Sequence, residues 1–342
     1  MTRRTLIVGI SSAVALVVVV SAAFMFGGSS SSAPAKKTAQ ESTAPRNRVQ
    51  QPLTSPFTGR RISYLRRVLI FKIDNVPQAR PPTGLSRADI VYLLPVEGGL
   101  SRIFAVFSSR IPRVVGPVRS TREEDIKLLN QFGRPAFAFS GAQPGLLPVV
   151  QHSRIVSLYA GTHYDAYFRS FNRFAPYNLY ARARILFGQA RARHASLARD
   201  IGFRFGPAPP GGKPTNSYYV RYPAARFRFV WSRAQHRWLV WMDGTRSYGL
   251  DGPRLGGATV VIEYVRVTKS PFRELGYRPP YANTVGQGHA VVLRDGRAWH
   301  VHWKRPDKNG GTTFTLADGH RMLFARGQVW VVFAIGPRST IG

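Results

Sequence analysis

The chain begins with an apolar run that carries no charge and limits where a globular fold can start. The run extends from Leu6 to Phe26 and is interrupted only by one glycine and three serines. As a helix it would be about 30 Å long, close to the thickness of a bilayer's hydrocarbon core. Two arginines precede it at positions 3 and 4, and the far side is neutral as far as Lys36. The positive-inside bias therefore places the N-terminus in the cytoplasm and the remaining chain outside.

This pattern predicts a signal anchor over residues 1–27, with one transmembrane helix at residues 6–26. The expected localisation is the cell membrane, single-pass, with the globular domains on the extracytoplasmic side. Cleavage of the segment stays open, because the small residues at 31–35 would suit a signal peptidase. Residues 28–52 are mainly small and polar residues, rich in Ser, Ala, Pro and Gln, with little to bury, which is typical of a disordered linker.

The rest of the chain predicts an α+β fold in two parts. Residues 53–205 read as a mixed α/β domain, with strands at 68–73, 89–94, 101–107, 113–118 and 135–139. A helix begins near Thr121, and a second helix at 180–200 places its many arginines on a solvated face. A Pro/Gly cluster at 206–214 separates this domain from a mainly β domain at 215–342. Strands are expected there at 217–222, 227–231, 238–242, 258–267, 290–293, 298–303, 313–316 and 329–334, with Asp-Gly pairs in the turns.

The charge of the chain points to an anionic partner. Lysine and arginine number 49 against 16 acidic residues, which gives a net charge of +33. Such a chain repels itself unless anions are near, so anionic wall polymer, lipid head groups or nucleic acid fit it, nucleic acid least well. A GC-rich genome would also raise the arginine content, and this alternative stays open. The absence of cysteine excludes disulfides, thiolate catalysis and cysteine-bound zinc.

No motif in the sequence indicates a reaction, a metal or a cofactor. A nucleophile elbow, a phosphate-binding Walker loop, a dinucleotide-binding glycine motif and a zinc-protease motif are all absent. His300 and His302 share one face of an expected strand, but no third ligand is near them in sequence. Arginines alternate with aromatic residues at 167–174 and 226–233, a pattern that suits either nucleic-acid stacking or a half-buried strand. We therefore predict neither a metal site nor a cofactor.

Polar residues at the ends of the first domain's elements form the candidate site. Asp74 and Asn75 end a strand, Glu97 follows the next one, and the segment Arg119-Ser120-Thr121-Arg122 leads from a strand into a helix. A strand-to-helix turn offers free N–H groups to an anion, and arginines complete a clamp. Alternatively, the two acids pair with these arginines and pin the loops together.

Several segments in one order resemble the YerB-like lipoprotein family, also called the DUF3048 family. They are 71–75, 79–81, 84–92, 96–99, 102–104, 116–120 and 175–180, followed more weakly by 303–304, 318–319 and 327–330. The resemblance implies an envelope location. It adds Arg80, Arg102, Asn178 and Tyr180 to the candidate ligand-binding residues.

Three departures from the family pattern bear on function. This chain has no cysteine to carry a lipid, so its apolar segment would have to anchor it. Tyr177 stands where the family commonly has histidine, and Phe139–Gln143 replaces a His-Ala-Gly-Gly-Ser stretch. These changes favour binding over histidine-based catalysis. The leading hypothesis is an envelope protein that binds an anionic wall or membrane component. An envelope enzyme that uses Asp74 or Glu97 as acid and base, and a nucleic-acid-binding protein, are the alternatives.

Overall fold

Strands dominate the fold. Some are buried along their whole length, and others alternate between buried and exposed residues. The structure is a computed structural model that describes residues 52–273 and 276–336. β1 (Leu69–Asp74) is buried along its whole length, as expected for a central strand covered on both faces. β19 (Arg297–Arg305) mostly alternates exposed and buried residues, as expected for a sheet with one face in water.

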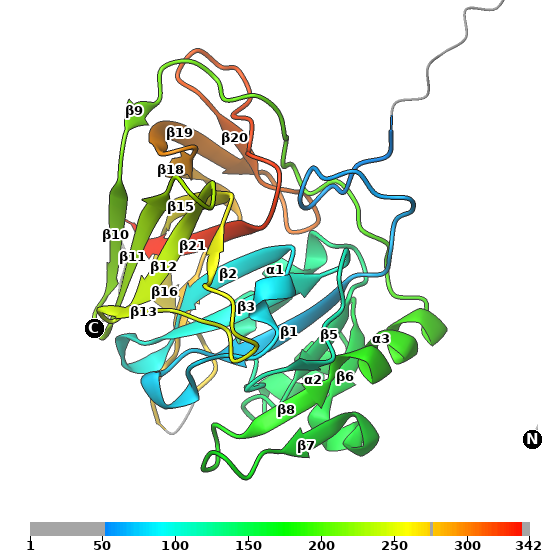
Figure 1. Cartoon of the computed structure of the whole chain (residues 1–342). Coiled ribbons are helices and arrows are strands. Elements are labelled where there is room, and N and C mark those ends of the chain that lie inside the picture. Colours follow the sequence, from blue (N-terminus) through cyan, green and yellow to red (C-terminus); the bar gives the residue numbers. More distant parts are fainter. Residues whose placement is uncertain (1–51, 274–275, 337–342) are drawn as a thin grey trace, which may run out of the picture. The chain divides into compact units, whose positions relative to one another are not determined.

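Among the described residues, the largest sheet has 11 strands (Figure 1). In the order in which they lie side by side, they are β20 (Thr313–Thr315), β19, β18 (Gly286–Arg294), β15 (Thr259–Val265), β21 (Val329–Ile335), β2 (Ile90–Pro95), β3 (Ser101–Phe107), β1, β5 (Ala136–Phe139) and β6 (Val156–Tyr159); β9 (Lys213–Pro214) pairs with β19.

The last strand of the chain joins the two halves of this sheet. β21 is parallel to both of its neighbours, and Val329 is paired with Ile90 of β2 on one side and Thr259 of β15 on the other. Residues 51–342 accordingly form one compact unit. The division into domains at 53–205 and 215–342 stays a prediction, because the two halves share one continuous sheet.

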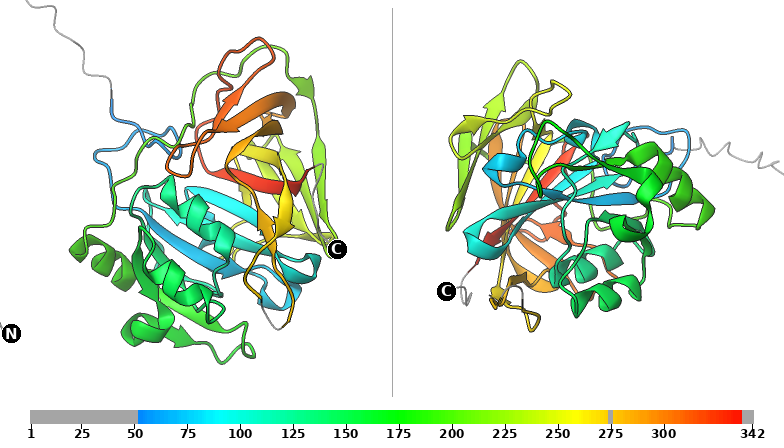
Figure 2. Two further views of the ribbon diagram at one scale, coloured as in Figure 1. Left: turned by 180° about the vertical axis from the view of Figure 1, so that it is seen from behind. Right: turned by 90° about the horizontal axis from the view of Figure 1, so that it is seen from below.

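A second sheet covers one face of the C-terminal half (Figure 2). Its strands are β10 (Ser217–Tyr222), β11 (Ala225–Ser232), β12 (Arg237–Met242), β13 (Thr245–Arg246) and β14 (Gly256–Gly257). Phe229 of this sheet packs edge-on against Trp330 of β21, with 6.3 Å between ring centroids. The Asp-Gly turn predicted at 243–244 joins β12 to β13, with both residues in the left-handed conformation that suits a tight hairpin.

Helices and a small sheet cover the N-terminal half. α1 (Glu123–Asn130) and α2 (Leu146–Gln151) pack in the same core cluster as Ile70, Phe104 and Phe137. α3 (Ala183–Ala192) lies over the opposite face, in the cluster that contains Leu69 and Phe71. The remaining strands are β4 (Val114–Val115), β8 (Leu179–Arg182) and β7 (Tyr167–Arg169) in one sheet, and β16 (Val267–Lys269) with β17 (Pro280–Ala282) in another. The short 3-10 helices are η1 (Pro77–Ala79), η2 (Leu85–Arg87), η3 (Glu97–Gly99), η4 (Ala160–Thr162) and η5 (Tyr164–Ala166).

The predicted α+β class, with a mixed first part and a β-rich second part, is confirmed. The helix predicted at 180–200 is wrong at both ends. Residues 179–182 pair with β4 and β7, and Tyr180 and Ala181 are buried there. Burial in this sheet outweighs the helix propensity of the Ala/Arg-rich segment. The helix ends at Ala192, just before His194 turns into the left-handed region with φ of 51°.

The predicted transmembrane helix at residues 6–26 lies outside the described residues, as does nearly all of the predicted linker at 28–52. Within residues 52–273 and 276–336, no helix combines the length and the apolarity that crossing a bilayer requires.

Candidate functional site

Asp74, at the end of β1, pairs with Arg119 of the segment that runs beside it. The Asp74 N–H donates to the Pro117 carbonyl oxygen, and the Arg119 N–H donates to the Lys72 carbonyl oxygen, both at 2.9 Å. This register brings Arg119 Nε to 2.9 Å from Asp74 Oδ2. The Asp74 side chain is 1% exposed and that of Arg119 is 26% exposed, so only the arginine reaches solvent.

Glu97 forms the second pair, with Arg122. Arg122 Nε donates to Glu97 Oε1. Arg122 is held in place because its backbone N–H donates to Asp125 Oδ2 at 2.9 Å, which caps α1. Burial raises the pKa of the Glu97 carboxyl, but the hydrogen bond and charge of Arg122, with the charge of Arg102, outweigh it and hold that pKa below its ordinary value.

The turn after Glu97 requires glycine. Gly98 and Gly99 both have positive φ, at 66° and 68°, a conformation that glycine adopts without strain. A Cβ on Gly99 would lie 2.5 Å from Pro223 Cβ, so the turn also packs closely against the β10–β11 connection. Glu97 lines a pocket of about 680 Å³ here, together with Lys269, Arg278 and several prolines.

Arg102 of β3 pairs in register with Asp74 and is close enough to interact with the charges of both ion pairs. Its Nη1 donates to the Ser120 carbonyl oxygen at 3.2 Å. Burial and the positive charge of Arg122 lower the pKa of Arg102 to about 10, although Glu97 and Asp74 oppose that shift. The predicted residues from three separate segments therefore meet in one cluster. It holds three arginines and two carboxylates, and the carboxylates of Asp74 and Glu97 neutralise most of the arginines' positive charge.

Asn75 and Arg80 extend this cluster toward the β-rich half. The Asn75 side-chain amide donates to Ser101 Oγ at 2.9 Å. Arg80 donates through Nη2 to the Asn75 carbonyl oxygen at 2.6 Å and through Nη1 to Asp243 Oδ2 at 2.7 Å. These contacts tie the β1 end to the β12–β13 turn.

Asn178 and Tyr180 make their contacts elsewhere. Asn178 Oδ1 accepts a hydrogen bond from Arg169 Nη1 at 2.7 Å, within the β7–β8 hairpin. Tyr180 is buried, and its ring lies so close to Gly116 that a Cβ there would come within 2.6 Å of it. Tyr180 thus supports the backbone before Arg119 without reaching the cluster. As a ligand site the predicted set stays a prediction, and its geometry favours a binding or structural role over acid–base catalysis.

Sequence reasoning missed the buried charges beneath this cluster. Lys72 Nζ lies 2.6 Å from Asp125 Oδ1, and both side chains are 0% exposed. Glu124, the neighbour of Asp125, is buried with both carboxylate oxygens unpaired among the described residues. Burial and the adjacent Asp125 raise the pKa of Glu124 to about 8. A lysine in the middle of an otherwise apolar strand is the signal that could have revealed this pair.

The two histidines of the expected strand have one further histidine beside them. His300 and His302 are exposed on β19, and the His302 ring lies 4.8 Å from that of His289 on β18. Across the residues that the structure describes, no group of three or more metal-ligating side chains converges.

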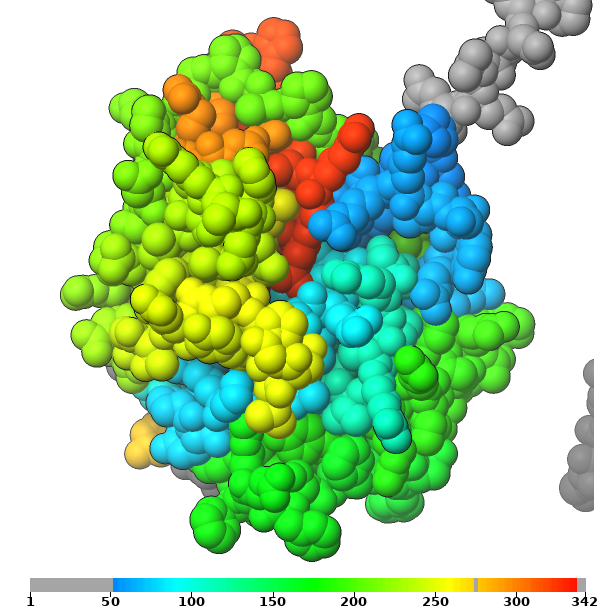
Figure 3. Space-filling view, viewed as in Figure 1, coloured from blue at the N-terminus to red at the C-terminus, as the bar shows by residue number. Residues whose placement is uncertain are grey.

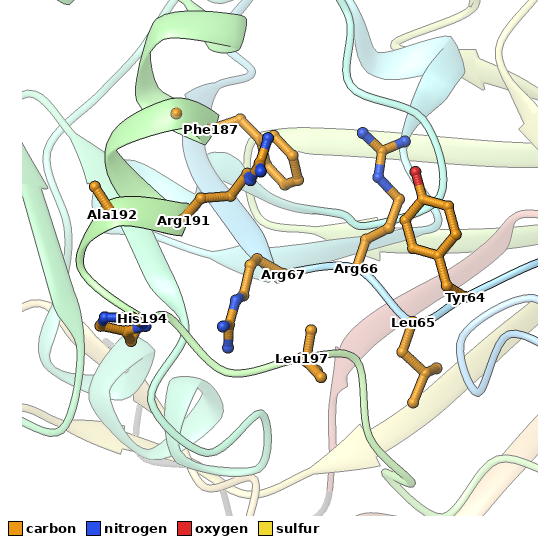
Figure 4. Close-up of a pocket in the computed structure, with 10 residues that line it drawn as sticks. Tyr64, Leu65, Arg66, Arg67, Phe187, Arg191, Ala192, His194 and Leu197 are labelled. Carbon is orange, nitrogen blue, oxygen red and sulfur yellow. The ribbon is translucent and has the colours of Figure 1, made fainter.

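Sequence reasoning also missed a basic pocket beside α3, which we call the α3 pocket (Figure 4). It measures about 780 Å³ and is lined by Tyr64, Leu65, Arg66, Arg67, Phe187, Gly188, Arg191, Ala192, His194 and Leu197. No carboxylate is among these residues. Arg184 and Arg191 of α3 are both exposed, in agreement with the predicted solvated face, and Arg191 also lines this pocket (Figure 4).

Two arginines that shortly precede β1 are fixed in the α3 pocket by neutral partners. The Arg66 guanidinium lies 5.0 Å from the centre of the Phe187 ring and donates to the Ser109 carbonyl oxygen at 3.0 Å. Arg67 donates to the Ala195 carbonyl oxygen at 2.7 Å. None of the ion pairs among the described residues involves Arg66, Arg67 or Arg191. The pocket therefore presents positive charge that no acid of the described residues neutralises.

Comparison with known families agrees with the arrangement of the segments. The profile described as "Protein of unknown function (DUF3048) N-terminal domain" matches residues 57–196, and the profile of the corresponding C-terminal domain matches residues 218–331. The chain belongs to the DUF3048 family. The resemblance predicted from the sequence is thereby confirmed, and Asp74, Glu97, Arg102, Arg119 and Arg122 all lie within the N-terminal DUF3048 domain.

A relative that is similar in both sequence and structure supports this assignment. The Bacillus subtilis (strain 168) protein named "Putative lipoprotein YerB" is 25% identical over 307 residues, which cover 86% of this chain and 88% of that protein. The crystal structure of YerB from Bacillus subtilis has the same fold, with a TM-score of 0.71 and 22% identity. That match covers 82% of this chain and 96% of the other.

Proposed function

We propose that this protein is a membrane-anchored, extracytoplasmic envelope protein whose body, residues 51–342, binds an anionic wall or membrane component through the α3 pocket. The ligand groups that fit are phosphates or carboxylates carried by a polymer or by lipid head groups. The observation that carries the proposal is the convergence of Arg66, Arg67 and Arg191 in a pocket with no carboxylate.

Guanidinium groups suit such ligands because their planar donors match phosphate and carboxylate oxygens. In the predicted cluster, the guanidinium groups of Arg119 and Arg122 already face Asp74 and Glu97, so an incoming anion would have to displace an internal carboxylate. In the α3 pocket no such competitor is present among the described residues. The net charge of +33 would add long-range attraction for any polyanion.

The proposed location has two supports. A relative that shares most of its length with this chain bears the name of a lipoprotein. The uncharged run at residues 6–26 offers this chain an anchor that needs no cysteine. An envelope location also supplies the phosphate-bearing polymers and lipids that the pocket would take.

Binding to defined probes tests the proposal. The body would be titrated with poly(glycerol phosphate), with phosphatidylglycerol vesicles and with a single-stranded oligonucleotide, at 50 and 200 mM salt. We expect binding to at least one of the first two probes, weakening about tenfold or more at the higher salt as counterions compete. No binding to either probe at 50 mM salt would overturn the proposal. Tighter binding of the oligonucleotide than of both other probes would favour the nucleic-acid alternative.

A further inference from the structure

The β7–β8 hairpin protrudes from the lower edge of the body in the view of Figures 1 and 3. Its strands pair from Tyr167 opposite Ala181 to Arg169 opposite Leu179. Residues 170–178 form the connecting loop. This loop contains most of the family segment 175–180, whose Asn178 the sequence had assigned to the ligand site.

Hydrogen bonds fix the base of this loop. The Ser170 N–H donates to the Asn178 carbonyl oxygen at 2.8 Å, and the Asn178 side-chain amide donates back to the Ser170 carbonyl oxygen at 3.3 Å. Arg173 donates to the Ala79 and Pro81 carbonyl oxygens at 2.6 and 2.8 Å. The loop is therefore held in a defined position against the body.

The same loop leaves two large apolar side chains in water. Phe171 is 102% exposed and Phe174 is 91% exposed, the highest values among the large hydrophobic residues that the structure describes. A phenylalanine contributes to a fold by burying its ring, and neither ring does so here. Exposed aromatic rings on an ordered loop indicate a contact with a partner.

The charge around these rings indicates which partner. Residues 166–182 contain three arginines and no acidic residue. Arg169 ends β7 where the loop begins, and Arg173 lies within the loop, so positive charge lies next to the apolar tip. Aromatic side chains beside arginines are the combination that proteins use at the surface of anionic bilayers, where rings enter the head-group region and guanidinium groups meet phosphates.

We infer that the tip of the β7–β8 hairpin docks on an anionic lipid bilayer by inserting Phe171 and Phe174 among the head groups. This inference rests on the membrane location in the proposed function, but it is independent of the α3 pocket. The 25 residues predicted as a linker at 28–52 can extend to at most about 85 Å, so such a linker would not dictate which face of the body meets the membrane.

A fluorescent label tests the insertion directly. Because the chain has no cysteine, Phe171→Cys gives the body a single attachment site for an environment-sensitive dye. Tyr219→Cys is the matched control, since Tyr219 is an exposed aromatic residue on β10 with Arg228 stacked on its ring at 5.0 Å. With phosphatidylglycerol vesicles, we expect a blue shift and stronger emission from the dye at position 171 and none at position 219. No shift at position 171, or an equal shift at both positions, would overturn the inference.

Partitioning measurements complete the test. We expect Phe171→Ser with Phe174→Ser to weaken partitioning of the body onto these vesicles at least about tenfold, and Tyr219→Ser to leave it within about twofold. Unchanged partitioning of the double variant would contradict the inference. Arg191→Glu separates the two proposals: it should impair binding of poly(glycerol phosphate) while the dye at position 171 still shifts. The experiment therefore distinguishes a wrong α3 pocket proposal from a wrong hairpin inference.

Discussion

Lys72 and Asp125 form an ion pair of 2.6 Å in which neither side chain reaches solvent. Lys72 lies in the middle of β1, and Asp125 is in the first turn of α1, where it also accepts hydrogen bonds from Thr121 Oγ1 and the Arg122 N–H. The pair therefore connects the central sheet to the segment that carries Arg119 and Arg122. Charges buried this deeply fix the geometry of the cluster above them.

Removing one partner of this pair should destabilise the fold. Lys72→Met leaves the Asp125 carboxylate buried without its cation, which should lower the free energy of unfolding by about 3–5 kcal/mol. Urea denaturation of the body measures this change. Lys304→Met on the exposed face of β19 is the control and should cost less than about 0.5 kcal/mol. A loss below about 1 kcal/mol for Lys72→Met would contradict the role given to the pair.

The Arg119–Asp74 and Arg122–Glu97 pairs should contribute to stability in the order in which their arginines are buried. Arg122 is 5% exposed and Arg119 is 26% exposed, so Arg122→Ala should destabilise more than Arg119→Ala. We expect about 3 kcal/mol for Arg122→Ala and about 1–2 kcal/mol for Arg119→Ala, since Asp74 keeps its hydrogen bond from the Asn75 N–H. Thermal and urea unfolding of both variants would show the order. The reverse order would mean that Arg119 carries more of the cluster's stability than its exposure suggests.

Buried acids should make the protein less stable as the pH rises. Burial raises the pKa of Glu263 from 4.5 to about 8, and the charge of Arg305 only partly opposes this. Between these two values the unfolded chain loses the proton while the folded chain keeps it. Stability therefore falls with rising pH in this window, by up to about 1.4 kcal/mol per pH unit for one group. Glu263→Gln should flatten this slope in urea midpoints measured from pH 5 to pH 8. An identical slope in wild type and variant would contradict the assignment.

Local patterns predicted most of the elements but not the pairings of charges. Apolar runs such as β1 and alternating runs such as β11 were predictable because their periodicity follows directly from burial. The insertion of β21 between β2 and β15 was not, since it pairs β21 with a strand more than 200 positions earlier in the chain, β2. The cluster was predictable from the residues that end strands, and so was the alternative in which its acids pair with its arginines. The sequence did not predict which acid meets which arginine: Arg119 pairs with Asp74 and Arg122 with Glu97. The α3 pocket was not predicted because Arg66 and Arg191 come from distant segments of the chain, and only the fold places them together.

The proposed topology has its own test in cells. With the N-terminus in the cytoplasm and an anchor at residues 6–26, protease added to intact, wall-stripped cells should degrade the body. Immunoblotting with an antibody against the C-terminal half would follow the loss. Full protection that disappears only on lysis would place the body inside the cell and contradict the extracytoplasmic location.

The most direct test of the central claim compares two charge reversals on one helix. Arg191→Glu and Arg184→Glu change the net charge equally, and both residues are exposed on α3, but only Arg191 lines the α3 pocket. Binding of poly(glycerol phosphate) to the body at 50 mM salt would be measured for both. We expect a loss of about tenfold or more for Arg191→Glu and less than about threefold for Arg184→Glu. Equal losses would show that the anion responds to overall charge and not to the pocket.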